Sequence, residues 1–381
     1  ALVARFVLSA AVLCLCLEPS WQDRLCLNES ARGVTRFMNY SQRANPVLIP
    51  YPLWVTAQIN AQICSIILSE VMMYETKLVQ IDSLSTSPVM NLAAGCLDPY
   101  DTACTHSDVD NPPIHFTIES WANGVTQRNN IPISIRPKFL NYLSWRGDDS
   151  YYLWNEVLEA GLNSPQRLSL DFYRSYDARN QPHQFFDPWA RILSVVPDDL
   201  LVRCSAMTPG SPYDRFASQY TAATNDTNVT CYRDVVWFSP ACRGDPSRCV
   251  PTLIAYSVHK IMQLATFHNM PLAIAVVSSS ADGGYAGFFR AVRGGRFLFT
   301  YWAPDDELFD AALQPPVQLS LPAQNSAEQA AGIYRTGAEA LNIPNFGWLE
   351  LEEVDPRVHF FAQQFSSGST SDMAAMMAHS R

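Results

Sequence analysis

Charge is scarce in this chain. Charged residues make up 16% of its 381 residues, with 26 Lys and Arg against 36 Asp and Glu. The formal net charge is −10, and Lys and Arg nowhere form a cluster. Without a basic cluster, binding to nucleic acid or to an anionic lipid surface has no electrostatic support. We therefore expect no nucleic-acid partner.

The sequence also lacks the short motifs of several enzyme classes. It contains no Gly-x-Ser-x-Gly, no His-Glu-x-x-His, no Walker-type loop and no Cys-x-x-Cys pair. We therefore predict a non-catalytic protein without a metal or an organic cofactor. One alternative stays open, a secreted glycoside hydrolase that uses two carboxylates. The candidate carboxylate pairs are Asp148-Asp149, Asp198-Asp199 and Asp305-Asp306. Acids that are adjacent in sequence are more often solvated surface charges than catalytic pairs.

Long apolar runs are missing beyond the N-terminus. Arg5 precedes an apolar run from Phe6 to Leu17, which is too short to cross a bilayer and has the length of a signal-peptide core. We predict a signal peptide over residues 1–20, with an uncleaved anchor as the alternative. The remainder is expected to be secreted or to lie at the extracellular face of a membrane.

Cysteine is present in a number that suits export. Apart from Cys14 and Cys16 in the predicted signal peptide, eight cysteines follow, an even number typical of disulfides. Two predicted pairs close short, turn-rich loops, a third closes a longer loop, and the fourth pair is what remains. In that order they are Cys96–Cys104, Cys242–Cys249, Cys204–Cys231 and Cys26–Cys64. Predicted glycosylation sites begin at Asn28, Asn39, Asn225 and Asn228.

Hydrophobic periodicity predicts an α/β protein with two α/β units. Near the N-terminus, alternating and apolar runs predict strands at 47–51, 76–81 and 115–119. Helices are predicted between them at 54–74 and 88–94, which implies parallel strands. The middle of the chain is irregular apart from a helix at 151–160. The remaining predicted elements are helices at 253–268, 286–292, 327–341, 357–364 and 372–379 and strands at 272–277, 297–301 and 317–321.

Three tryptophans follow the ends of predicted strands, namely Trp54, Trp121 and Trp302. In open parallel sheets, ligands collect at the carboxyl ends of the strands. Aromatic faces gathered there favour a box for an organic cation, which ring quadrupoles attract. Each ring could instead plug a strand end and pack on the core. Trp145 could line the cleft as part of a lid, whereas core packing is expected for Trp154.

The residues around these tryptophans resemble a known family. Tyr51-Pro52-Leu53-Trp54, Glu119-Ser120-Trp121 and Phe299-Thr300-Tyr301-Trp302-Ala303-Pro304 are similar to segments of the substrate-binding proteins of glycine betaine/choline-type ABC transporters. That resemblance implies the type II periplasmic-binding fold, with mixed sheets flanked by helices and a ligand cleft between two lobes. The long middle segment resembles extracellular versions of the domain in some unicellular eukaryotes.

The resemblance also implies domain bounds, a ligand and its contacts. Lobe 1 would comprise residues 46–135 and 310–381, and lobe 2 residues 136–309 with a disulfide-bearing, glycosylated insertion. An aromatic cage would capture a small quaternary-ammonium solute, similar to glycine betaine or choline, for transmembrane transport with a membrane permease as partner. A ligand-sensing ectodomain joined to a receptor module is the alternative. The residues implied in ligand binding are Trp54, Trp121, Trp302 and Tyr256. Glu119 could pair with a cationic ligand or simply lie at a polar strand end.

Overall fold

The computed structural model describes residues 35–83, 85–206, 217–255, 258–278, 286–303, 316–338 and 340–366, together with Met376. Several predictions lie outside these residues: the signal peptide, Cys26, Asn28, Tyr256, and the helix at 372–379 apart from Met376. Within the described residues, no helix is long and apolar enough to span a bilayer.

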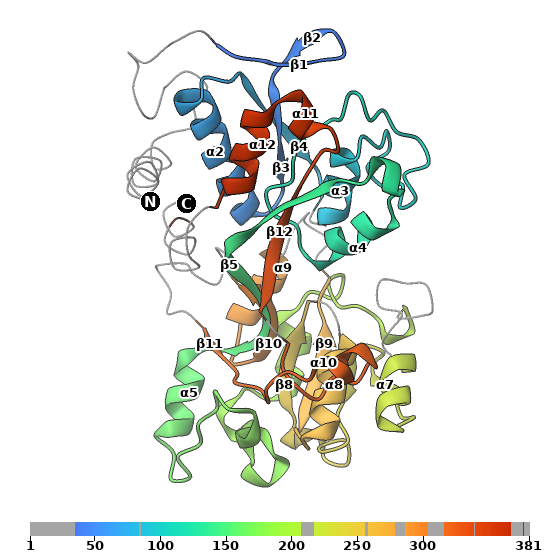
Figure 1. Cartoon of the computed structure of the whole chain (residues 1–381). Coiled ribbons are helices and arrows are strands. Elements are labelled where there is room, and N and C mark those ends of the chain that lie inside the picture. The colour runs from blue at the N-terminus through green and yellow to red at the C-terminus, as the bar shows by residue number, and fades with distance from the viewer. Residues whose placement is uncertain are drawn as a thin grey trace. The chain divides into compact units, whose positions relative to one another are not determined.

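The chain folds into two compact units (Figure 1). Unit 1 takes the described residues up to Gly147 and from Ala340 onward, and unit 2 takes Asp148–Ala303 and the described part of Ala311–Glu339. The predicted boundary at 135/136 therefore lies too early, because the long strand β5 (Lys138–Leu153) begins in unit 1 and ends in unit 2. The segment 316–338, predicted in lobe 1, belongs to unit 2.

Unit 1 is built from short sheets and helices. Besides the first part of β5, its elements are β1 (Met38–Tyr40), β2 (Arg43–Asn45), β3 (Val47–Pro52), α2 (Val55–Ile66), the π-helix η3 (Ile67–Val71), β4 (Thr76–Ile81), α3 (Thr86–Ala93), α4 (Ala122–Asn130), the 3-10 helix η4 (Ile133–Ile135), β12 (Leu341–Gly347), α11 (Leu351–Val354) and α12 (Pro356–Gln364). The predicted parallel pairing of the first two strands is confirmed, since β3 and β4 pair in parallel. Figure 1 shows α2 and α12 on one side of β3, and α3 with α4 on the other.

The third predicted strand, at 115–119, is wrong as a strand. The segment 114–120 is buried throughout and forms only one isolated bridge, Phe116 to Gly347. Two side chains of this segment accept hydrogen bonds from main-chain amides of the neighbouring strands, where main-chain carbonyls would accept in a regular sheet. The Leu48 amide donates to the imidazole Nδ1 of His115 (2.9 Å), and the Phe346 amide donates to the hydroxyl of Thr117 (2.8 Å). The segment is therefore tied to both β3 and β12 without completing a ladder.

Unit 2 contains seven strands of a mixed eight-stranded sheet, in the order β11-β5-β10-β8-β9-β7-β6, and the eighth strand, β12, pairs with the unit 1 part of β5. Its three central strands β10, β8 and β9 run parallel, and the outer strands pair antiparallel. Besides the end of β5, its longer elements are α5 (Asn155–Leu162), α6 (Ile192–Val195), α7 (Ala217–Thr224), β6 (Cys231–Tyr232), β7 (Val236–Phe238), β8 (Val250–Ile254), α8 (Val258–Phe267), β9 (Leu272–Val276), α9 (Ala286–Arg293), β10 (Leu298–Ala303), β11 (Val317–Gln318) and α10 (Ser326–Ala330). Its short 3-10 helices are η5 (Tyr173–Tyr176), η6 (Ala178–Asn180), η7 (Pro182–Phe185), η8 (Trp189–Arg191), η9 (Cys204–Ala206) and η10 (Pro246–Arg248).

Three predicted helices in this part of the chain begin or end in the wrong place. Residues 151–153 complete β5, and the helix starts only after Trp154. Residues 253 and 254 belong to β8, whose five residues are all buried, so no amphipathic period separates strand from helix there. The predicted helix 327–341 ends at Ala330 because Gly332 adopts a left-handed conformation (φ 78°). Leu341 then begins β12.

Three of the four predicted disulfides are formed: Cys96–Cys104, Cys204–Cys231 and Cys242–Cys249. The predicted pairing of Cys26 with Cys64 is wrong, because Cys64 is a free thiol buried in the core of unit 1. Disulfides persist in oxidising compartments, so their presence is typical of exported proteins. The exposed asparagines Asn39, Asn225 and Asn228 begin predicted glycosylation sites, which stay predictions.

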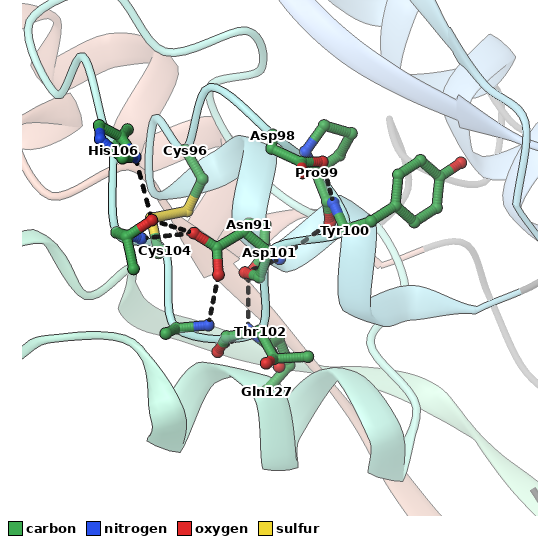
Figure 2. Close-up of a disulfide and its surroundings, with 12 residues drawn as sticks. Asn91, Cys96, Asp98, Pro99, Tyr100, Asp101, Thr102, Cys104, His106 and Gln127 are labelled. Atoms are coloured by element: carbon green, nitrogen blue, oxygen red, sulfur yellow. Dashed lines mark hydrogen bonds between the residues drawn. A yellow bond between two sulfur atoms is a disulfide. The ribbon is translucent and has the colours of Figure 1, made fainter. Parts of the chain in front are cut away.

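The loop closed by Cys96 and Cys104 is held by two buried amides (Figure 2). Asn91 of α3 donates to the carbonyls of Pro99 (2.8 Å) and Asp101 (3.0 Å). Gln127 of α4 donates to the Asn91 amide oxygen (2.7 Å) and to the Thr102 carbonyl (2.9 Å). The disulfide and the two amides therefore connect the loop to both helices on this side of β3.

Candidate functional site

Two of the predicted ligand-binding tryptophans lie at equivalent positions in unit 1. Trp54 is the N-cap residue of α2 and Trp121 is the N-cap residue of α4. Both have extended backbones and neither side chain caps its helix. Both rings are partly exposed. The two indoles are therefore available for other contacts, and the N–H group of each needs an acceptor.

That acceptor is the same for both indoles. Trp54 donates from Nε1 to Oε1 of Glu119 (2.9 Å), and Trp121 donates from Nε1 to the same oxygen (2.6 Å). The structure therefore brings together three of the five predicted residues. The N–H edge of each ring faces the buried carboxyl group, and both partly exposed tryptophans also pack against the core of unit 1.

Two further donors complete the surroundings of Glu119. The hydroxyl of Thr56 donates to Oε1 (2.9 Å), and Asn60 Nδ2 lies 3.4 Å from Oε2. Sequence reasoning missed both residues. The available signal was a pair of polar side chains, one helical turn apart, on the apolar and buried face of α2. Buried polar residues need partners, so such a pair indicates a polar group packed against the helix.

Glu119 is itself almost fully buried, at 1% exposure. Burial raises its pKa to about 7, and the hydrogen bonds from Trp121, Thr56, Trp54 and Asn60 oppose that rise. All four donors are neutral groups. Within the described part of the chain, Glu119 makes no ion pair. The site therefore holds a carboxyl group with no ion-pair partner among the residues that the structure describes.

The ring of Trp121 is fixed from a second direction. It packs against Trp145, which is fully buried, with ring centroids 6.2 Å apart. Gly147 lies still closer, since a Cβ added there would come within 2.3 Å of the Trp121 ring. Only glycine allows this approach of β5 to the indole. Trp145 is thus a packing residue beneath Trp121, and the expectation that it lines a lid is wrong.

The other two predicted residues belong to unit 2. Trp302 was expected to follow a strand, but β10 continues to Ala303, and Trp302 pairs with Asp149 in the ladder. Its ring stacks on Tyr301, with centroids 4.1 Å apart. Tyr256 lies outside the described residues, so its predicted role stays a prediction.

Of the acids proposed for a hydrolase, the structure describes the backbone at Asp148, Asp149, Asp198 and Asp199. Asp198 and Asp199 are both exposed. Asp149 lies 3.7 Å from the ammonium group of Lys260. Asp305 and Asp306 lie outside the described residues. Within the residues searched, no group of three or more His, Cys, Asp or Glu is placed to hold a metal ion.

Comparisons with known proteins find a structural similarity but no sequence match. No family model matches the chain, and no curated protein matches its sequence. One solved structure to which the chain is similar is lactococcal OpuAC in its closed-liganded conformation, complexed with glycine betaine. The similarity covers 87% of each chain, at 11% sequence identity and a TM-score of 0.38.

Proposed function

We propose that this protein is a solute-binding protein and that Trp54 and Trp121 bind a small organic cation of the quaternary-ammonium class. The observation that carries the proposal is the pair of partly exposed indoles whose N–H groups share one oxygen of the buried Glu119. The proposed activity is capture rather than catalysis.

Two physical effects favour a cation at these rings. The face of an indole carries negative electrostatic potential and attracts alkylammonium groups by about 0.5–2 kcal/mol per ring. Donation of an N–H to a carboxylate polarises the indole further, because hydrogen-bonded groups in a low-dielectric interior strengthen one another. An approaching cation also offsets the charge of Glu119, which has only neutral partners.

We further propose that capture takes place outside the cell and delivers the solute to a membrane permease, as the resemblance implies. The three disulfides support an oxidising compartment. Copurification of the full-length protein with a permease would support delivery. Continuation of the reading frame into a membrane helix and a cytoplasmic domain would favour the receptor alternative.

Calorimetric titration of the purified protein with choline, glycine betaine and tetramethylammonium tests the binding proposal. We expect saturable binding of at least one of these quaternary-ammonium solutes and weaker binding of 3,3-dimethylbutan-1-ol, the uncharged analogue of choline. Absence of binding by all three solutes at millimolar concentration would refute the proposal. Equal affinity for the uncharged analogue would show that the site does not recognise the positive charge of its ligand.

Single substitutions test which tryptophans contact the ligand. Trp54→Leu and Trp121→Leu should each weaken binding by about 5- to 30-fold, which corresponds to about 1–2 kcal/mol. Trp154→Leu is the matched control, because Trp154 is also an N-cap tryptophan but donates to the Val292 carbonyl instead of a carboxylate. Trp302→Ala tests the remaining candidate, and an unchanged affinity would remove Trp302 from the site.

A further inference from the structure

The contacts of Glu119 differ between its two oxygens. Oε1 accepts three hydrogen bonds, from Trp54, Trp121 and Thr56. Three donors on one oxygen suit a carboxylate, because hydrogen bonds to an ionised acceptor are stronger than those to a neutral one. Thr56 also lies in the first turn of α2, where the helix dipole favours an anion. This side of the site is thus built for the ionised form.

The other oxygen has a partner that suits both forms. Asn60 is fully buried and places Nδ2 3.4 Å from Oε2, while its own amide oxygen has no hydrogen-bond partner. A buried amide oxygen without a donor is costly. Half a turn about the last side-chain bond exchanges the two ends of the amide. Oδ1 would then face Oε2 and accept a hydrogen bond from a protonated Glu119.

We propose that Glu119 and Asn60 form a proton switch beneath Trp54 and Trp121, so that binding of the cation and protonation of Glu119 exclude each other. The switch rests on the proposed function and adds its regulation. When the cation binds, Oε2 releases a proton to solvent and Asn60 donates through Nδ2. When the cation leaves, Oε2 takes up a proton from solvent, and the turned Asn60 amide accepts it in a hydrogen bond.

Protonation weakens the site in two ways. It removes the negative charge beneath the rings, and it weakens the three hydrogen bonds to Oε1, which are then no longer charge-assisted. The two indoles and Thr56 are therefore held less firmly. Glu119 is therefore a positioning residue, which acts on the ligand through the tryptophans.

The other charged and titratable groups on the elements around Glu119 do not supply an alternative proton switch. The helix α2 carries no charged residue, and β12 carries none. On the segment of Glu119 itself, His115 is held neutral, since burial lowers its pKa to about 3. Arg128 of α4 donates to the Pro137 carbonyl, and β5 contributes Lys138 and Arg146 to unit 1. The shift at Glu119 comes mainly from burial, opposed by its four neutral donors.

Titration of the wild-type protein with tetramethylammonium at pH 6, 7 and 8 tests the switch, because this probe keeps its charge throughout. We expect the dissociation constant to fall by about tenfold between pH 6 and pH 8. At pH 7, where Glu119 is half protonated, binding should release about half a proton, read from the dependence of the binding enthalpy on the ionisation enthalpy of the buffer.

Two conservative variants should move the pH profile by different amounts. Thr56→Val removes a donor from the ionised form only and should shift the midpoint to higher pH by about half a unit to one unit. Asn60→Leu removes a partner of both forms, the donor to the ionised carboxylate and the acceptor for the protonated acid, and should shift the midpoint by less than about half a unit. An upward shift with Asn60→Leu as large as that with Thr56→Val would show that Asn60 is only a donor and would contradict the turning amide. Glu119→Gln should bind more weakly and without pH dependence.

The outcomes separate the two proposals. Failure of the wild-type protein to bind the probe, choline or glycine betaine at any of these pH values overturns the proposed function, and the switch with it. Binding with a constant affinity from pH 6 to pH 8 and no proton release overturns the switch alone. Should Glu119→Gln fail to fold, the wild-type profile and the Thr56→Val and Asn60→Leu pair still decide.

Discussion

Two buried ionisable side chains, His115 and Glu119, lie four residues apart on the segment 114–120, and burial moves their pKa values in opposite directions. The pKa of His115 falls to about 3, and the pKa of Glu119 rises to about 7. His115 Nδ1 accepts from the Leu48 amide, so Nε2 carries the proton and donates to the Tyr40 hydroxyl. Both side chains therefore favour their neutral forms in the folded protein.

Their effects on stability oppose each other as pH changes. The folded pKa of His115 is depressed, so the unfolded chain binds a proton first, and stability is lost as pH falls below about 6.5. The folded pKa of Glu119 is raised, so the folded chain holds its proton longer. Stability from Glu119 is present below pH 4.5 and is lost as pH rises to about 7. Between these limits the two effects offset each other.

Replacing Glu119 by Gln should expose this balance. We expect the difference in unfolding free energy between Glu119→Gln and the wild type to grow in favour of the variant by about 2–3 kcal/mol from pH 5 to pH 8. The variant alone should lose stability steeply on acidification, because the effect of His115 is no longer offset. Urea denaturation at both pH values measures the difference, and a difference that stays constant with pH would contradict it.

At the residue scale, part of the site could be predicted from sequence. Tryptophans after strands drew attention to Trp54 and Trp121, and the acid beside one of them is their shared acceptor. The convergence of Thr56 and Asn60 on that acid could not be read from the sequence, because it depends on how α2 packs against a segment about sixty residues away. The need for glycine at 147 likewise appears only when Trp121 lies against it.

At the scale of elements, α12 is fixed at its first turn by Asp355. Its carboxylate accepts from the amides of Arg357 (3.0 Å) and Val358 (3.1 Å), which caps the helix, with Pro356 in the first position. The same carboxylate accepts from the hydroxyl of Tyr74 (2.9 Å), far away in sequence. One side chain thus both starts a helix and attaches it to the chain between α2 and β4.

Asp355→Ala should therefore destabilise the protein by more than the loss of a cap alone. A cap contributes about 1 kcal/mol, and the stranded Tyr74 hydroxyl adds a further loss on the order of 1 kcal/mol. Tyr74→Phe should remove only the second part, and Asp355→Asn should retain most of the first. A double-mutant cycle by chemical denaturation measures the coupling. Additive effects of Asp355→Ala and Tyr74→Phe would show that the tie contributes nothing.

Element types were predictable where the pattern was local. Parallel β3 and β4 around an amphipathic helix follow from periodicity, and α12 starts one residue before its predicted position. The errors lie where tertiary pairing decides. Residues 151–153 pair with β10 and β11, so they extend a strand although their sequence also fits a helix. The segment at 115–119 has strand-like residues, but its side chains occupy the positions of main-chain acceptors.

At the scale of the whole molecule, three disulfides were predictable because their loops are short or turn-rich, whereas the change of unit at Gly147 was not. The sequence Gly147-Asp148-Asp149 is typical of a turn, but these residues lie within the continuous strand β5, so no break in secondary structure marks the change of unit. The fourth predicted pair failed for a related reason. Counting cysteines cannot show that Cys64 faces the core of unit 1.

The disulfides of unit 2 should contribute unequally. Cys204–Cys231 spans 27 residues and Cys242–Cys249 spans 7. Chain entropy then predicts a loss of about 3–4 kcal/mol on replacing the first pair by alanines, and about 2–3 kcal/mol for the second. Thermal and urea denaturation of the two double variants measure the order. A larger loss for the short loop would show that packing around Cys242 and Cys249, both nearly fully buried, outweighs the entropy of the unfolded chain.

The free thiol of Cys64 has a practical use. Among the described residues it is the sole unpaired cysteine, and it is inaccessible within α2, the helix that also supplies Thr56 and Asn60. A thiol reagent can modify it only when that helix separates from its neighbours. The rate of modification, followed by mass spectrometry of the Cys64 peptide, therefore measures how often unit 1 opens, and a bound solute should lower that rate.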